Sequence, residues 1–240
     1  MDILAIKTVF SINFAGVSIP ITETVIVSWL VMLLLIAGSI LLTRRLKEIP
    51  AGPQAILEIG VEFLNNFAKD KFGSFSKFLG PYIGTVFLFL LAANIIGVIS
   101  PIELKAFGRE FHPPFVIRPP TRDINVTGAL ALMSISLVLI FGFASRGFVG
   151  WFKRLLYPLP LMLPFNILEY ATRLISLALR LFGNILGCFV LMKLIEGLLP
   201  VVLPVVFSLY LDFFDGALQA LIFVFLTSIY LSEAIKLHEE

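Results

Sequence analysis

Five long apolar stretches, each about as long as a lipid bilayer is thick, constrain the fold of this chain more than any other feature. About 20 helical residues cross the roughly 30 Å hydrocarbon core of a bilayer. Hydrophobic residues fill 59% of the 240 positions and charged residues only 14%, against about 25% charged in soluble domains. We therefore predict an all-α integral membrane protein, a single transmembrane domain over residues 1–240 with five spans: 22–43, 81–100, 123–144, 163–199 and 201–232.

A sixth helix is predicted at the membrane surface, over residues 52–72. It mixes polar and apolar side chains at helical spacing, which is typical of an amphipathic helix lying in the interface. Its polar residues include Glu58, Glu62, Asn65, Asn66 and Lys69.

The last two spans are predicted to form a long, steeply tilted helical hairpin over residues 163–232. At 1.5 Å per residue the first of them would be about 52 Å long, so burying most of it requires a tilt of about 55°, beyond the usual range of about 0–40°. Pro200 and Pro204 mark the turn.

Basic residues predict the orientation of the chain. Because cytoplasmic loops carry an excess of Lys and Arg, we expect the N-terminus outside and the C-terminus inside. The inner group is Arg44, Arg45, Lys47, Lys69, Lys71, Lys77, Arg146, Lys153, Arg154 and Lys236, whereas Lys105, Arg109, Arg118 and Arg122 lie in an outer loop with compensating acids.

Several function classes are excluded for want of their parts. A net charge of +2 is too small to indicate a nucleic-acid partner, and the single cysteine, Cys188, allows neither an intrachain disulfide nor a cysteine-based metal site. The chain has no phosphate-binding loop and no zinc-protease motif. We expect a non-catalytic protein without cofactor or metal, and no removable signal peptide in the first 20 residues.

Arg180 is the residue that points most directly to function. It is the only charged residue between Leu174 and Met192, and an arginine at lipid depth costs roughly 3 kcal/mol on insertion scales and does not lose its proton. Helical spacing places it on one polar stripe with Arg173, Ser176, Asn184 and Gly187. The sequence therefore predicts a fixed intramembrane cation.

The returning helix carries its own polar stripe of Asp212, Asp215 and Gln219. An antiparallel hairpin folded about residue 202 places Gln219 beside Arg180 and Asn184, within a turn. Asp212 and Asp215 then lie toward Glu196 and the outer surface. A cation at one depth with a trail of carboxylates leading outward is the predicted site.

Each of these residues can instead have a purely structural role. Arg180 can form a structural ion pair with Asp215, and Glu196 can pair with Lys193. Asp123 begins a span, where a carboxylate caps a helix and meets its positive dipole; for Asn94 and Asn125, hydrogen bonds between helices are the plainer role than ion binding.

The segment Ser176-Leu-Ala-Leu-Arg-Leu-Phe-Gly-Asn184 resembles the arginine signature of subunit a of the F-type ATP synthases. The stretch from Leu218 to Ser232 is similar to the last-helix signature of that family. Weaker agreement comes from segments 119–125, 94–97 and 165–169, so the resemblance covers most of the chain from residue 22 onward.

The resemblance implies an ion-translocating stator subunit that forms two offset half-channels against a rotating ring of c subunits. Arg180 would face the ring carboxylates, with Asn184 and Gln219 beside it and Asp212 at an ionisable family position. Many members carry an ionisable residue where this chain has Phe189. The remaining candidate residues are Ser176, Glu196 and Asp215, with Asp123, Asn94, Asn125, Glu169 and Arg173 as possible access-channel residues.

The implied partners are the c-ring, b-type peripheral stalk subunits, the F1 sector indirectly and the lipid bilayer. The implied location is an energy-coupling membrane, that of bacteria first and the thylakoid as an alternative. We expect the proton as the coupling ion, with Na⁺ as the alternative. A stand-alone channel or secondary transporter is the rival, although no internal repeat supports it.

Overall fold

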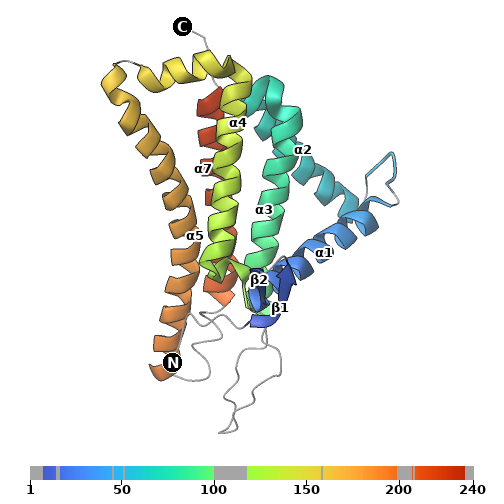
Figure 1. Ribbon diagram of the computed structural model, residues 1–240. Coiled ribbons are helices and arrows are strands. Elements are labelled where there is room, and N and C mark those ends of the chain that lie inside the picture. Colours follow the sequence, from blue (N-terminus) through green and yellow to red (C-terminus); the bar gives the residue numbers. More distant parts are fainter. Residues whose placement is uncertain are drawn as a thin grey trace, which may run out of the picture. The chain divides into compact units, whose positions relative to one another are not determined.

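The chain, in a computed structural model, is described at residues 8–14, 17–44, 46–50, 52–99, 118–157, 159–198, 207 and 209–235. Nearly all of these residues are helical, as Figure 1 shows. Five helical stretches are long and apolar enough to cross a membrane: Glu23–Thr43, Gln54–Ile96, Ile124–Ser145, Pro160–Met192 and Phe213–Ile235. The prediction of an all-α integral membrane protein with five transmembrane helices is confirmed.

The long helices follow the apolar pattern closely. They are α1 (Glu23–Thr43), α2 (Pro53–Phe72), α3 (Ser76–Ile99), α4 (Ile124–Leu156), α5 (Leu163–Leu198) and α7 (Gly216–Ile235). Short 3-10 turns precede three of them: η1 (Gly73–Phe75), η3 (Pro120–Arg122) and η4 (Pro160–Met162). The bounds of α1, α2 and α5 agree to within one or two residues with the helices predicted over 22–43, 52–72 and 163–199. The position of α2 at the membrane surface stays a prediction.

Helix α3 begins five residues earlier than predicted. We expected Pro81 to start the span, but it lies inside the helix. Proline removes one backbone hydrogen bond there, while Thr85 Oγ1 donates to the Pro81 carbonyl oxygen at 2.7 Å. One lost bond near the start of a long apolar helix does not end it.

Helix α4 continues beyond the predicted end of the third span at residue 144. It is broken at Gly147, whose φ of 69° and ψ of 167° are not helical. Glycine adopts positive φ without the steric penalty of a side chain. The break separates the apolar span from a short helical segment that contains Lys153 and ends at Leu156.

The returning helix is not one regular α-helix. Residues 199–206 and 208, with the predicted turn at Pro200 and Pro204, lie outside the described part. A π-helical segment, η5 (Leu209–Asp215), leads directly into α7, which runs three residues past the predicted end. Propensity and periodicity contain no signal for such an i→i+5 turn.

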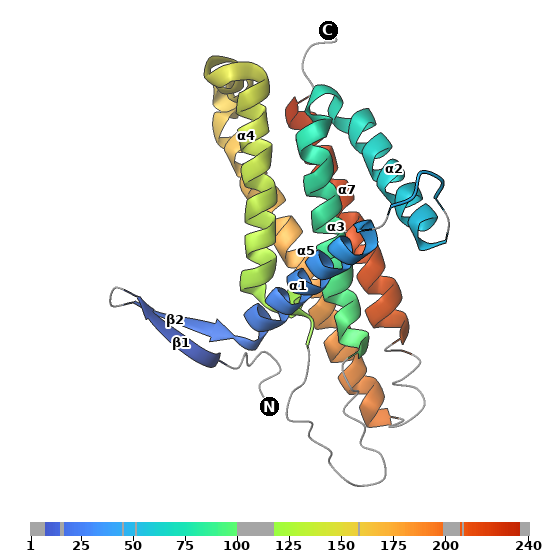
Figure 2. The ribbon, with the colours of Figure 1, turned by 90° about the vertical axis from the view of Figure 1, so that its right-hand side faces the viewer.

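A two-stranded antiparallel hairpin precedes α1 and was not predicted. Strands β1 (Thr8–Phe14) and β2 (Val17–Thr22) pair from Phe14 with Val17 to Thr8 with Thr22 (Figure 2). Both strands alternate β-branched or aromatic residues with polar ones, the ordinary strand signal.

The chain forms two compact units, and each collects residues from three separate stretches. The first comprises Met1–Ser39, Leu88–Thr127 and Leu181–Ala220; the second comprises Ile40–Phe87, Gly128–Arg180 and Leu221–Glu240. Helices α1, α3, α4, α5 and α7 contribute residues to both units, so the units are not successive domains of the sequence.

The core of the first unit joins α1 to α3. Val27 and Val31 of α1 pack with Ile96 of α3, and all three are less than a tenth exposed. Leu35 and Phe89 pack against this cluster. Spacing of four residues along α1 places these side chains on one helix face.

The second unit is held by close helix packing and aromatic contacts. A Cβ built on Gly80 of α3 would lie 3.2 Å from the Cβ of Ala68 on α2, so these helices approach closely through small residues, as membrane helices commonly do. The ring centroids of Phe143 and Trp151 lie 4.2 Å apart across the Gly147 break.

Candidate ion-translocation site

Arg180 lies in the middle of α5, which is continuous over 36 residues. Its side chain is exposed, and it forms no ion pair with any side chain that the structure describes. Ser176, one turn earlier, is also exposed, and Asn184, one turn later, is partly buried.

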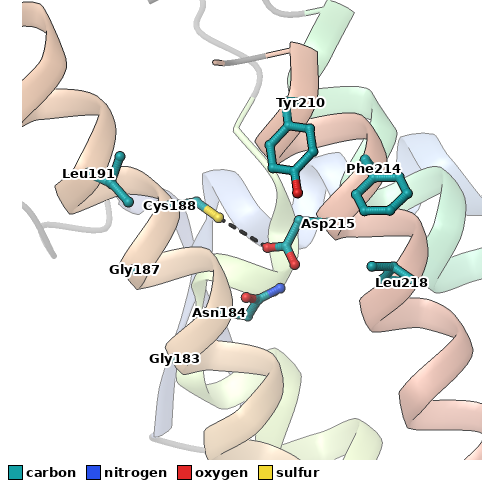
Figure 3. Close-up of a pocket in the computed structure, with 9 residues that line it drawn as sticks. All are labelled: Gly183, Asn184, Gly187, Cys188, Leu191, Tyr210, Phe214, Asp215 and Leu218. Carbon is teal, nitrogen blue, oxygen red and sulfur yellow. Dashed lines mark hydrogen bonds between the residues drawn. The ribbon is translucent and has the colours of Figure 1, made fainter.

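Asp215 lines an open pocket of about 300 Å³ in the first unit. In Figure 3, Asn184 and Cys188 from α5 face Tyr210 and Asp215 from η5 across this pocket. Cys188 Sγ donates a hydrogen bond to Asp215 Oδ2 at 3.3 Å. The remaining lining residues are Gly183, Gly187, Leu191, Phe214 and Leu218.

The pairing of Cys188 with Asp215 reports the register of the returning chain. Its midpoint lies at about residue 202, the point about which the antiparallel hairpin was predicted to fold. The contact with Cys188 therefore agrees with the predicted register. The expected position of Asp215 toward Glu196 stays a prediction, because the structure does not describe the Glu196 side chain.

Asp123 makes the contacts of a helix cap. Its Oδ1 accepts the Asn125 backbone N–H at 2.9 Å and the Asn125 side-chain amide at 3.0 Å. Its Oδ2 accepts the hydroxyl of Thr24 on α1 at 2.8 Å. Asp123 is only 3% exposed. Its carboxylate accepts hydrogen bonds from the first turn of α4 and from Thr24 near the start of α1, so it links the two helix ends.

Asn94 is 2% exposed and uses both ends of its amide. Its Nδ2 donates to the Gly216 carbonyl oxygen at 3.0 Å, and its Oδ1 accepts the Thr121 hydroxyl at 2.8 Å. These are hydrogen bonds between helices, as the plainer reading of the sequence expected.

Gln219 is also buried, at 4% exposure, on α7. Among the described residues its Nε2 has no hydrogen-bond acceptor. A buried amide without a partner costs about 1–3 kcal/mol.

Arg173 is the centre of a charged cluster in the second unit. Its Nη2 hydrogen-bonds Glu169 of α5 and lies 2.7 Å from Glu233 Oε2 of α7. Its guanidinium also lies 4.6 Å from the ring centroid of Tyr230. Sequence reasoning found Glu169 and Arg173 but missed Glu233, whose only signal is an acidic residue at the end of an apolar helix.

Phe189 is covered by a cation that the sequence reasoning did not anticipate. The Arg122 guanidinium lies 5.4 Å from the Phe189 ring centroid, and Arg122 is 7% exposed. Burial lowers the pKa of the Arg122 guanidinium, as does the neighbouring Arg118, while Glu23 and Asp123 act to raise it. A buried cation over an aromatic face is worth about 2 kcal/mol.

The side chains of two predicted carboxylates lie outside the described part. The structure describes the backbone at Glu196 and Asp212 but not their side chains, so their places in the site stay predictions.

Comparison with known proteins gives a consistent result. The ATP synthase A chain family matches residues 25–232. The chain is 35% identical over 216 residues, 90% of this chain and 75% of the relative, to the "ATP synthase subunit a, sodium ion specific" of Propionigenium modestum. These matches show that the chain belongs to the ATP synthase subunit a family, the non-catalytic, ion-translocating stator subunits of the membrane sector.

Proposed function

We propose that this chain forms two offset half-channels against a ring of c subunits, and that Arg180 separates them. The observation that supports this most is Arg180 itself, an exposed guanidinium at lipid depth that no described carboxylate neutralises. A permanent cation there repels an ion that would cross directly between the half-channels. It also favours the ionised form of a ring carboxylate that faces it.

The neighbours of Arg180 have supporting roles in this scheme. Ser176 and Asn184 share its stripe on α5, and Gln219 brings a buried amide from α7. These groups hydrate or hydrogen-bond the ring carboxylate as it passes.

The outer half-channel is lined by acidic and amide side chains. They are Glu196, Asp212, Asp215, Asn94, Asp123 and Asn125, of which Asn94 and Asp123 shape the helices that form it. The inner half-channel opens near Glu169 and Arg173. An ion enters from outside, neutralises a ring carboxylate and leaves inside after nearly a full turn, because only the neutral site tolerates lipid.

The chain resides in an energy-coupling membrane, most simply the inner membrane of a bacterium. Its N-terminus lies outside and its C-terminus inside, by the distribution of basic residues. Its partners are the c-ring and the b-type peripheral stalk, with the F1 sector linked through them. At about 2.3 kcal/mol per charge per 100 mV, the membrane potential becomes torque on the ring.

The proposed coupling ion is the proton. Na⁺ is the second candidate, and the sodium specificity stated for the Propionigenium modestum relative supports it. ATP-driven pumping in vesicles with Na⁺ replaced by K⁺ separates the two. A proton-coupled complex keeps its full rate without Na⁺, and a strict Na⁺ requirement contradicts proton coupling.

The role of Arg180 is tested in the reconstituted whole complex. Arg180→Ala is expected to abolish ATP-driven pumping while the complex still co-purifies with its ring. Arg180→Lys is expected to restore little, because an ammonium lacks the planar guanidinium fork and deprotonates more readily when buried. Normal pumping by Arg180→Ala refutes the proposal.

A further inference from the structure

The pocket beside η5 contains the Asp215 carboxylate. Its side chain is contacted from α5, and the backbone next to it is contacted from α3. Asp215 is the last residue of the π-helical segment and is partly buried at the pocket wall. π-helical turns are rare and occur frequently at functional sites. Among the described residues, the titratable groups that line this pocket are Cys188, Tyr210 and Asp215.

Cys188, on α5, orients the Asp215 carboxylate. Its thiol donates to Asp215 Oδ2 at 3.3 Å, and Figure 3 shows the two side chains meeting across the pocket. A thiol is a weak donor, but a hydrogen bond to an ionised acceptor is stronger than one to a neutral acceptor. The contact favours one rotamer of Asp215.

Asn94, on α3, holds the backbone immediately after Asp215. The Gly216 carbonyl oxygen, which accepts from Asn94 Nδ2 at 3.0 Å, belongs to the residue that follows Asp215. Asn94 is held in turn by the Thr121 hydroxyl at 2.8 Å. A Cβ built on Gly216 would lie only 2.9 Å from the Asn94 Cβ. This Thr121–Asn94–Gly216 clamp therefore holds the junction of η5 and α7 in one position.

We infer that Asp215 is the carboxylate that takes up the ion in the outer half-channel, and that Cys188 and Asn94 are its positioning residues. The inference rests on the proposed function and selects one group from the outer acidic residues. The pocket is open and has room for several waters at about 300 Å³, so an ion reaches the carboxylate through water. The clamp keeps Asp215 within reach of the Cys188 thiol while the neighbouring ring rotates.

The test compares variants of the whole complex in vesicles by ATP-driven pumping across a range of pH. Asp215→Asn is expected to lower the pumping rate about tenfold or more, while Asp215→Glu retains more activity with a displaced pH profile. Cys188→Ala is expected to lower the rate and displace the pH profile, and Cys188→Ser, which keeps a donor, to restore both. Leu194→Ile, on the same helix outside the pocket, is the matched control.

Asn94 is tested in the same assay. Asn94→Leu removes both ends of the clamp with similar volume, and it is expected to displace the pH profile in the same direction as Cys188→Ala. Wild-type pumping by Asp215→Asn overturns the inference for Asp215. An unmoved pH profile in Cys188→Ala or in Asn94→Leu overturns the positioning role of that residue.

Two measurements keep the outcome decisive. If Asp215→Asn fails to co-purify with the ring, alkylation of Cys188, the single cysteine of this chain, replaces it as the perturbation in wild type. Complete alkylation, read on this chain by mass spectrometry, is expected to stop pumping, and unchanged pumping overturns the inference. Failure of Arg180→Ala to stop pumping would instead refute the proposed function, so the two failures are distinguishable.

Discussion

At the scale of single residues, the polar side chains of this membrane protein divide into those that use their hydrogen bonds inside the chain and those that do not. Asp123 and Asn94 use theirs at helix ends and junctions. Arg180 and the Nε2 of Gln219 have no such partner among the described residues. Under the proposed function, the partner of Arg180 is a carboxylate of the c-ring.

Asp123 is predicted to act chiefly through stability. Asp123→Leu removes the cap of α4 and the bond from Thr24, so it is expected to destabilise the chain by about 1–2 kcal/mol. Asp123→Asn keeps one acceptor oxygen and is expected to lose less. Thermal unfolding of the purified complex measures both. Lost pumping at unchanged unfolding temperature in Asp123→Leu would contradict a capping role.

Gln219 is predicted to act in coupling and not in packing. Gln219→Leu fills a similar volume and removes the unpartnered Nε2, so stability should rise or stay constant while the ratio of ions pumped to ATP hydrolysed falls. Leu221→Ile, on the exposed side of the same helix, is the control. Equal coupling ratios in the two variants would make Gln219 a packing residue.

At the scale of elements, two segments depart from the regular helix that propensity predicts. Asp215 ends the π-helical η5 and accepts a hydrogen bond from Cys188, and α4 is broken at Gly147, just after the apolar span that ends at Ser145. Both are local departures from regular geometry inside long apolar segments.

Gly216 is predicted to be intolerant of a side chain. The Cβ of Gly216→Ala would lie 2.9 Å from the Asn94 Cβ, and such overpacking costs typically about 1–3 kcal/mol. Gly128→Ala, where nothing lies within 4 Å of the new Cβ, is expected to stabilise α4 by about 0.5–1 kcal/mol. Unfolding of the two variants side by side provides the comparison, and equal stability would argue against a tight junction.

Arg173 is predicted to fix the C-terminal end of α7 on α5. Arg173→Gln loses contacts to Glu233 and to the ring of Tyr230 together, whereas Glu169→Gln removes only a neighbour on the same helix. Because both carboxylates are about half exposed, each ion pair is worth little. Hydrogen exchange at residues 228–235 should therefore rise modestly in Arg173→Gln and hardly at all in Glu169→Gln. The reverse order would contradict this account.

At the scale of the whole molecule, the apolar pattern was sufficient to predict five spans. In lipid, backbone N–H and C=O groups can hydrogen-bond only to one another. An apolar stretch of bilayer length therefore forms a transmembrane helix. Arg180 was also identified from the sequence, because a charged residue within an apolar span is energetically costly and marks a candidate functional site.

The parts that the sequence did not predict depend on tertiary contacts. The donor to Asp215 is Cys188, the cation over Phe189 is Arg122, and the partner of Arg173 is Glu233. Each joins residues far apart in the chain, and none belongs to a local motif. The N-terminal hairpin is different, since the alternation typical of strands is present in its local sequence.

The central claim is that Arg180 prevents an ion from crossing directly between the half-channels. The most direct measurement is passive ion flux through reconstituted complexes whose rotor is locked to the stator by a cross-link, under an imposed membrane potential. With rotation blocked, wild type should be tight, and Arg180→Ala should leak ions at a rate that rises with the potential. A locked Arg180→Ala complex as tight as wild type would contradict the claim.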